Sequence, residues 1–233
     1  VYFVEQMLHH ARRETHGAKV LISGSGNVAQ FAALKVTELG GKVLTFSDSG
    51  GTLFAPDGFD EQAMQEVFEL KNERRGRLAE LADDKRFDYL EGRRPWHIPA
   101  DIALPCATQN ELDGEDARAL VHNGVLCVAE GANMPSTLEA VDVFLQAGTL
   151  YAPGKASNAG GVATSGLEMS QNALRLSWRH ADVDERLHVI MKEIHANCVQ
   201  HGVRADGSVN YVDGANIAGF VKVADAMLAQ GLY

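Results

Sequence analysis

The chain has 233 residues, 45% of them apolar and 22% charged, which is an ordinary composition for a globular protein. Charged residues interrupt every apolar run well before the roughly 18 residues that a membrane-spanning helix needs, so no segment is predicted to cross a membrane. With 21 basic and 31 acidic side chains, the net charge of −10 argues against nucleic acid as a partner.

The first segment, residues 1–13, is predicted to be an amphipathic helix with Tyr2, Phe3, Met7 and Leu8 on one side. It has neither a basic start nor an apolar signal segment, and it does not begin with Met. We therefore expect this chain to be cut from a longer one.

Residues 19–48 have the order typical of a dinucleotide-binding site: an apolar strand, a glycine turn, a helix, a second strand and an acid. Gly24, Gly26 and Ala29 are spaced as G-x-G-x-x-A, and helical periodicity follows as far as Gly40. The second strand, at 43–46, leads to Asp48, about 20 residues beyond the glycines. The context of the glycines thus predicts that a dinucleotide binds here.

The glycine turn has a direct physical logic. Gly24 permits the tight turn, and Gly26 lets a pyrophosphate approach the backbone at the start of a helix, where free N–H groups donate to phosphates. Asn27 could donate to a phosphate or ribose, or it could cap the helix. The sequence leaves these two roles open.

The acid at the second strand end bears on the choice of coenzyme. Asp48 should accept hydrogen bonds from an adenosine ribose hydroxyl, and it would repel a 2′-phosphate. The helix predicted at 61–75 ends in a basic cluster of four cations: Lys71, Arg74, Arg75 and Arg77. This cluster is either a solvated helix end or a phosphate clamp that, with Ser49, offsets the repulsion. The residues alone leave NAD and NADP both open.

Strands and helices alternate through Pro153. Strands are predicted at 101–107, 125–129 and 150–153, a short extension at 52–55, and a polar, irregular stretch at 84–96. Helices are predicted at 115–122 and, with Ser136 and Glu139 as a capping box, up to about 147. The fold class is therefore α/β, a Rossmann-like, doubly wound, mostly parallel sheet, whose functional groups lie at the carboxyl ends of the strands.

Beyond Gly161 the pattern is helical. Asp182 with Glu185 is predicted to cap one helix, and apolar residues at helical spacing define a final helix that ends near Gly231. These helices are too few for an independent second domain. We expect them to flank the sheet or to reach toward a missing domain.

Several residues outside the glycine turn could carry chemistry, but each also has a structural interpretation. Lys155 is interpreted as a solvated loop lysine rather than a catalytic amine. His188 and His195 are one heptad apart and are predicted to lie on a helix surface, and no histidine has the spacing of a metal site. A polar set on one side of a helix is interpreted as a solvent-facing surface: Glu168, Asn172 and Arg175.

The three cysteines, Cys106, Cys127 and Cys198, are odd in number and far apart. Two of them sit in apolar strand-like runs. They are predicted to be buried, reduced thiols of a cytoplasmic protein, with no disulfide and no metal.

Several motifs resemble those of one family. The matching segments are S-G-S-G-N-V-A at 23–29, D-I-A-L-P-C-A-T-Q-N-E at 101–111, A-E-G-A-N-M-P at 129–135, P-G-K through N-A-G-G-V-A-T-S-G-L-E at 153–168, and G-A-N-I-A-G-F-V-K-V-A-D-A-M at 214–227. Together they cover essentially the whole chain. They resemble the C-terminal, cofactor-binding domain of bacterial hexameric glutamate dehydrogenases of the NADP-dependent kind.

The resemblance implies reversible oxidative deamination of L-glutamate to 2-oxoglutarate and ammonia by hydride transfer to NADP, with NAD less favoured. It implies that Asn133 lies near the nicotinamide, that Ser165 binds the far carboxylate of the substrate, and that Asp48, Ser49 and Lys71 surround the 2′-phosphate. The cofactor-binding set predicted in this way is Ser23, Gly24, Ser25, Gly26, Asn27, Val28, Asp48, Ser49, Lys71, Ala107, Thr108, Gln109 and Asn133.

The resemblance also implies what this chain lacks. The family's catalytic lysine and aspartate lie in an N-terminal domain, so no catalytic residue is assigned here, and Lys155 does not inherit the role. The expected organisation is one dinucleotide-binding domain over 1–233, with an entry helix at 1–16, a Rossmann core at 17–160 and helices at 161–233 that would pack toward the missing domain of a homohexamer. In isolation the final helix should expose an apolar stripe or pack differently.

Two other functions remain as alternatives. The chain could be a stand-alone dinucleotide-binding module, or part of an NAD-dependent sister amino-acid dehydrogenase that acts on apolar substrates. The hydroxyl of Ser165 argues against the sister enzyme, because an apolar substrate offers no distal carboxylate.

Overall fold

The computed structural model describes residues 1–231. Its centre is a five-stranded sheet in the order β2-β1-β6-β7-β8, in which all neighbouring strands are parallel. The strands are β1 Lys19–Ile22, β2 Lys42–Val43, β6 Ile102–Leu104, β7 Cys127–Ala129 and β8 Leu150–Ala152. The strand order reverses between β1 and β6, which is where a doubly wound sheet binds its ligand. The predicted Rossmann-like fold class is confirmed.

The prediction of one strand at 43–46 was wrong, because these residues belong to two strands. β2 ends at Val43, and after Leu44 the chain enters a second, antiparallel sheet in the order β3-β4-β5: β3 Thr45–Asp48, β4 Gly51–Phe54 and β5 Asp88–Glu91. The hydroxyl of Thr45 accepts from the Ile22 N–H at 2.9 Å and donates to the Ile22 carbonyl at 3.0 Å. A side chain thus satisfies the backbone of β1 where its neighbouring strand turns away.

β4 confirms the extension predicted at 52–55, whereas β5 lies in the stretch that was predicted to be irregular. β5 is an edge strand whose residues are all exposed or half-buried, so its sequence lacks the apolar alternation that reveals a strand. It is held by its register with β4, in which Leu53 faces Tyr89 and Thr52 faces Leu90.

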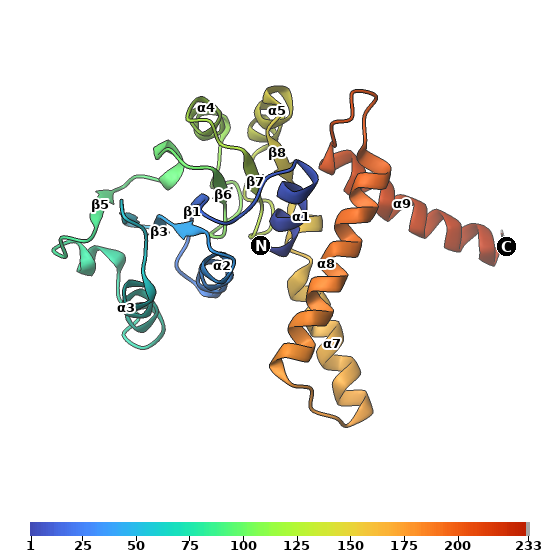
Figure 1. Cartoon of the computed structure of the whole chain (residues 1–233), viewed down its shortest axis with the longest axis horizontal. Coiled ribbons are helices and arrows are strands. Elements are labelled where there is room, and N and C mark those ends of the chain that lie inside the picture. The colour runs from blue at the N-terminus through green and yellow to red at the C-terminus, as the bar shows by residue number, and fades with distance from the viewer. Residues whose placement is uncertain (232–233) are drawn as a thin grey trace.

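Helices cover both faces of the parallel sheet (Figure 1). α1 and α2 pack on one face, and α4 and α5 pack on the other. Their bounds are α1 Tyr2–His10, α2 Asn27–Glu38, α3 Glu61–Asn72, α4 Gly114–His122 and α5 Leu138–Ala147, with short 3₁₀ turns at η1 Leu78–Leu81 and η2 Pro95–His97.

Three of these helices differ from their predicted ends. α1 stops at His10 rather than at 13, and Arg12 lies beyond it with φ of 58°. α3 stops at Asn72 rather than at 75, and Arg75 lies beyond it with φ of 53°. α5 is capped by Thr137, whose hydroxyl accepts from the Ala140 N–H at 3.3 Å, so the predicted capping box at Ser136 was wrong.

The last four helices are α6 Gly154–Ser157, α7 Gly160–Leu174, α8 His180–Gly202 and α9 Tyr211–Gln230. α8 begins after Arg179, whose N–H donates to Asp182 at 3.2 Å, so Asp182 is the third helical residue rather than the predicted cap. α7 has no buried residue, and α9 exposes Phe220, Met227 and Leu228, which is the first of the two outcomes predicted for the final helix. Both helices extend away from the sheet (Figure 1). The last two residues of the predicted segment 161–233 lie outside the described residues.

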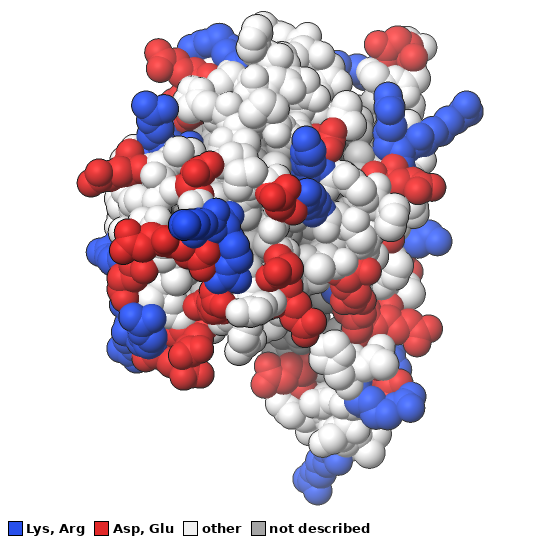
Figure 2. Space-filling view, turned by 60° about the vertical axis from the view of Figure 1, so that its left-hand side comes forward, with Lys and Arg blue, Asp and Glu red and all other residues white. Residues whose placement is uncertain are grey.

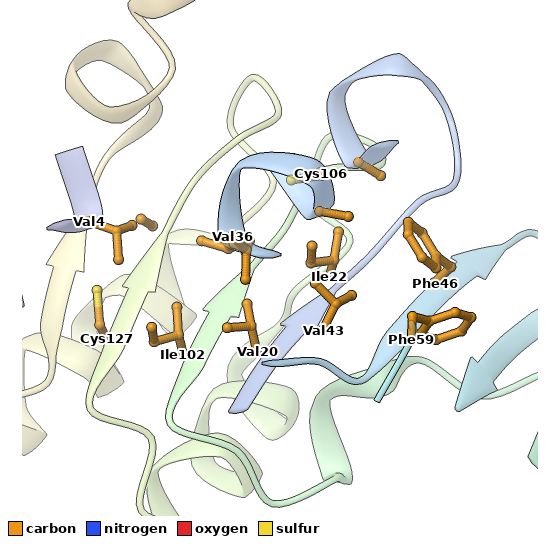
Figure 3. Close-up of a cluster of buried hydrophobic side chains, with 14 of the residues drawn as sticks. Val4, Val20, Ile22, Val36, Val43, Phe46, Phe59, Ile102, Cys106 and Cys127 are labelled. Carbon is orange, nitrogen blue, oxygen red and sulfur yellow. The ribbon is translucent and has the colours of Figure 1, made fainter. Parts of the chain in front are cut away.

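The core lies in two layers, one on each face of the sheet. Figure 3 shows the layer in which Val20, Ile22 and Ile102 of the strands meet Val4 of α1 and Val36 of α2. Leu21 and Ala103 point to the other layer, under α4 and α5. All three cysteines are buried and unpaired, as predicted, and burial raises the pKa of Cys106 and Cys127 to about 12.

Among residues 1–231 no helix is long and apolar enough to cross a bilayer. Acidic and basic side chains are interspersed on the face that carries β5 and α3 (Figure 2).

Candidate dinucleotide-binding site

A cavity of about 630 Å³ opens at the carboxyl ends of the parallel strands. It is bounded by the start of α2, by the segments that follow β6 and β7, and by α6 and the first turn of α7. The polar and charged residues in its lining are Thr108, Gln109, Asn133, Lys155 and Asn158. The predicted cofactor-binding residues Val28, Ala107, Thr108, Gln109 and Asn133 therefore come together around one cavity.

The glycine turn at the end of β1 has the geometry that its spacing predicts. Gly24 has φ of +81°, and a Cβ built on it would lie 3.1 Å from the Cys106 carbonyl oxygen, so a side chain has neither the conformation nor the space. The hydroxyl of Ser47 accepts from the Gly24 N–H at 2.8 Å and fixes the turn against β3. Above Gly26, in contrast, a Cβ would meet no atom within 4 Å.

The start of α2 is open as well. Gly26 is the N-cap residue, and no side chain accepts from the first helical N–H groups. Asn27 is the first residue of the helix and is exposed, so it does not cap α2, and the capping interpretation is excluded. Ser25 is buried, and its carbonyl accepts from Gln30 at 2.8 Å. Open space, unpaired N–H groups and the positive end of the helix dipole together form a place where an anion can bind.

The ends of β1 and β6 are joined by a polar network. The hydroxyl of Ser23 donates to Glu111 at 2.7 Å and accepts from the Cys106 N–H at 2.8 Å, and the Ala107 N–H also donates to Glu111 at 2.9 Å. Burial raises the pKa of Glu111, against the opposing effect of these hydrogen bonds. Ser23 is fully buried, and its hydroxyl therefore fixes neighbouring loops rather than facing the cavity.

The segments after β7 and β8 form the opposite wall. The side-chain amide of Asn158 donates to Asn133 Oδ1 at 2.8 Å and to the Ala132 carbonyl at 3.1 Å. Lys155 is exposed, as predicted, but lies on the short helix α6 rather than in a loop, and its ammonium donates to Asn216 of α9 at 2.6 Å.

A second group of predicted residues gathers at the end of β3. Asp48 accepts from the N–H of Leu78 at 3.0 Å and of Gly50 at 2.9 Å, and the Lys71 ammonium lies 3.4 Å from its Oδ2. Burial would by itself raise the pKa of Asp48, but these two N–H groups and the ammonium hold that pKa below its ordinary value. Asp48 is therefore an ionised carboxylate with the Lys71 ammonium beside it.

The four cations of the basic cluster do not act as one group. Lys71 also donates to the Gly76 carbonyl at 2.8 Å, and Arg77 donates to the hydroxyl of Ser49. Arg74 instead pairs with Glu80 at 2.7 Å. Lys71 and Arg77 are thus directed at the end of β3, and Arg74 is not.

Ser165 is not brought into the cavity. It lies on α7, three residues beyond Val162 of the lining, and its exposed hydroxyl donates to the Gly161 carbonyl at 3.2 Å. Glu168 and Asn172 are exposed on the same helix, as predicted. Arg175 is the left-handed residue after the helix end, with φ of 56°, so its place on that polar side was wrong.

The two histidines of α8 have different environments. His188 pairs with Glu5 at 3.1 Å and stacks on Tyr2, which ties α8 to α1. His195 is buried, contrary to its predicted place on a helix surface, and lies 3.1 Å from the Tyr211 hydroxyl. Burial, with His10 nearby, lowers the pKa of His195 to about 4.

Four residues that hold the site in shape were assigned no role from the sequence: Ser47, Glu111, Glu130 and Asn158. Three of them follow a strand of the parallel sheet, Glu111 after β6, Glu130 after β7 and Asn158 after β8 and α6. A polar residue that follows a buried strand is thus the available signal. Ser47, inside β3, gives none.

Comparison with known proteins agrees with this geometry. The family model described as glutamate/leucine/phenylalanine/valine dehydrogenase matches residues 1–231. The NADP-specific glutamate dehydrogenase of Escherichia coli is 58% identical over 232 residues, and the NAD(P)-specific glutamate dehydrogenase of Xylanibacter ruminicola is 56% identical over 233 residues. Each alignment covers 100% of this chain and 52% of the relative, so the chain spans about half the length of the curated relatives it matches.

Solved structures show the same likeness. The crystal structure of Plasmodium falciparum glutamate dehydrogenase superimposes with a TM-score of 0.95 at 41% sequence identity, over 100% of this chain and 50% of that one. The fold of this chain therefore recurs within a protein of about twice this length.

Proposed function

Because the chain belongs to the glutamate/leucine/phenylalanine/valine dehydrogenase family, we propose that it is the coenzyme-binding part of an NADP-dependent glutamate dehydrogenase. The reaction is the reversible oxidative deamination of L-glutamate to 2-oxoglutarate and ammonia. The observation that carries the proposal is the open anion site at Gly26, set at the strand switch point beside a cavity lined by polar residues.

The residues present fit a dinucleotide. A side chain at residue 26 would fill the space above the first turn of α2, and its absence leaves the N–H groups there free to donate to a pyrophosphate. Gly24, Ser25, Gly26, Asn27 and Val28 would hold this part of the cofactor. Ala107, Thr108, Gln109 and Asn133 would hold the ribose and nicotinamide that follow it, and Ser23 would keep their loops in register.

Residues at the end of β3 support NADP over NAD. Asp48 alone would repel a 2′-phosphate, but it is already paired with Lys71, and the Ser49 hydroxyl and the Arg77 guanidinium lie beside it. A 2′-phosphate that shares the Lys71 ammonium with Asp48 would gain a charge-assisted hydrogen bond. The names of the relatives include NADP-specific, NAD(P)-specific and NAD-specific enzymes, so the preference proposed for this chain rests on these side chains.

The bound coenzyme supplies the acceptor for the hydride that leaves the α-carbon of glutamate. This chain's own residues bind and orient that coenzyme. Ser165 would bind the far carboxylate of the substrate once the rest of the polypeptide closes over α7. The groups that move protons, a lysine and an aspartate, would come from that other part of a longer, cytoplasmic, hexameric enzyme.

Titration calorimetry with NADPH and NADH tests the proposal. We expect NADPH to bind this chain more tightly than NADH, and we expect no glutamate turnover by the chain alone. Equal affinities would contradict the NADP assignment, and turnover by a verified pure chain would mean that the catalytic groups lie within these residues.

A further inference from the structure

A buried carboxylate, that of Glu130, lies at the end of β7, behind the cavity wall that carries Asn133. Glu130 is 4% exposed. Its Oε1 accepts from the Ser136 N–H at 3.2 Å and from the Tyr151 hydroxyl at 2.6 Å, and its Oε2 accepts from the Gly154 N–H at 2.6 Å. Both oxygens of the carboxylate therefore act as acceptors, and three donors from separate segments converge on one side chain.

The backbone of the same residue reaches the same neighbours. The Glu130 N–H donates to the Ala152 carbonyl at 3.1 Å, and the Glu130 carbonyl accepts from the Ser157 hydroxyl at 2.6 Å. Glu130 is thus bonded to both segments of the wall, residues 131–136 and residues 152–157. It does not itself line the cavity at the strand ends.

These two segments must keep a fixed separation for the wall to exist. Asn158, just after α6, donates to Asn133 Oδ1 and to the Ala132 carbonyl across the gap between them. Gly154, the first residue of α6, is packed so closely that a Cβ on it would lie 3.0 Å from the Ala132 carbonyl oxygen. A shift of Gly154 away from Glu130 would therefore move Asn158 relative to Asn133.

We propose that Glu130 is a positioning residue, which holds Asn133 and Asn158 in place at the nicotinamide end of the site. The proposal rests on the proposed function, because it supposes that a dinucleotide extends from Gly26 to Asn133. It adds a residue that lies outside the lining of the strand-end cavity, in the lining of the adjoining one, and that sets the affinity for one half of the cofactor. The adenosine end, at Asp48 of the antiparallel sheet and Lys71 of α3, shares none of the hydrogen bonds of Glu130.

Glu130→Gln is the sharpest test, because it changes one acceptor into a donor and little else. An amide oxygen can still accept from Tyr151 and Ser136, but the amide N–H₂ would then face the Gly154 N–H, donor against donor. The disturbed wall must be restored when the nicotinamide end binds, so NADPH affinity should weaken by up to about 10-fold, the equivalent of one hydrogen bond to a charged group. The affinity for 2′,5′-ADP, which has the adenosine end alone, should change by less than about twofold.

A second variant and a matched control complete the experiment. Ser157→Ala removes the hydroxyl that donates to the Glu130 carbonyl and that also lies within hydrogen-bond distance of the Pro153 and Ala152 carbonyls. Because all three contacts lie in the same wall, this variant should weaken NADPH severalfold and leave 2′,5′-ADP unaffected, even if Glu130→Gln does not fold. Glu139→Gln changes an exposed carboxylate that pairs with Arg118 on the surface, and it should alter neither affinity.

Calorimetry with the two ligands separates the outcomes. A selective loss of NADPH affinity in Glu130→Gln and Ser157→Ala supports the positioning role. Equal losses for both ligands, or no loss for either, would overturn it while leaving the proposed function intact. Failure of the wild-type chain to bind either ligand would overturn the proposed function, and the positioning role with it.

Discussion

The contact between Lys71 and Asp48 allows the coenzyme preference to be tested at a single side chain. The Lys71 ammonium lies 3.4 Å from the Asp48 carboxylate, and the two side chains are 19% and 8% exposed. Lys71→Ala leaves that carboxylate, whose pKa is held low by Leu78 and Gly50 as well, ionised and without its cation. A 2′-phosphate would then meet an uncompensated negative charge and lose its ammonium partner.

The magnitude follows from the kind of contact. A hydrogen bond to a charged group contributes about 1.5–3 kcal/mol, which corresponds to a loss of roughly 10- to 100-fold in affinity for NADPH. NADH presents a ribose hydroxyl instead, from which Asp48 can still accept a hydrogen bond. The affinity for NADH should therefore fall by less than about threefold. The ratio of the two affinities, measured by calorimetry on wild type and variant, is therefore the quantity that changes.

Arg74→Ala is the matched control for this measurement. Arg74 belongs to the same basic cluster, but it pairs with Glu80, so its removal should leave the ratio unchanged. Because Lys71 also donates to the Gly76 carbonyl, the folding of the variant is to be checked by thermal unfolding. Equal losses for NADPH and NADH would refute the clamp and would assign Lys71 a structural role.

Two further predictions concern the glycine turn and α8. Gly26→Ala should fold normally, because its Cβ would meet no atom within 4 Å. It should weaken the binding of NADPH and NADH alike by about 10-fold or more, because the added methyl group fills the space proposed for the pyrophosphate. A folded variant that still binds both coenzymes tightly would show that the pyrophosphate does not lie there. His195 is buried, and its pKa is lowered to about 4 from an ordinary 6.5. As the pH falls from 6.5 toward 4, the imidazole is protonated in the unfolded chain but not in the folded one, so the free energy of unfolding should decrease over that interval. Denaturant unfolding at several pH values should show this loss in the wild type and a smaller one in His195→Asn, and parallel profiles would contradict it.

Much of the fold could be predicted because its signals are local. The apolar strands, the glycine turn and the helix that follows it are contiguous in the chain, and the strand-end rule then indicated where the cavity forms. The split between β2 and β3 was not predictable in this way, since it depends on the hydroxyl of Thr45 reaching the backbone of Ile22. β5 was missed because an edge strand need not bury either face.

The errors in caps and burial have a similar cause. Ser136 and Thr137 are both good capping residues, and Thr137 takes the cap while the N–H of Ser136 donates to the carboxylate of Glu130. His195 faces Phe3 and Tyr211, from helices at the two ends of the chain, and the periodicity of one helix carries no information about such packing. The same limit applies to the site, where Glu111 and Ser23 are 88 residues apart.

The most direct test of the proposed binding mode is a crystal structure of this chain with NADPH bound. We expect the pyrophosphate above Gly26 at the start of α2, the 2′-phosphate within hydrogen-bond distance of the Lys71 ammonium, and the nicotinamide beside Asn133. A cofactor bound with its 2′-phosphate away from Lys71, or outside the cavity at the strand ends, would contradict it.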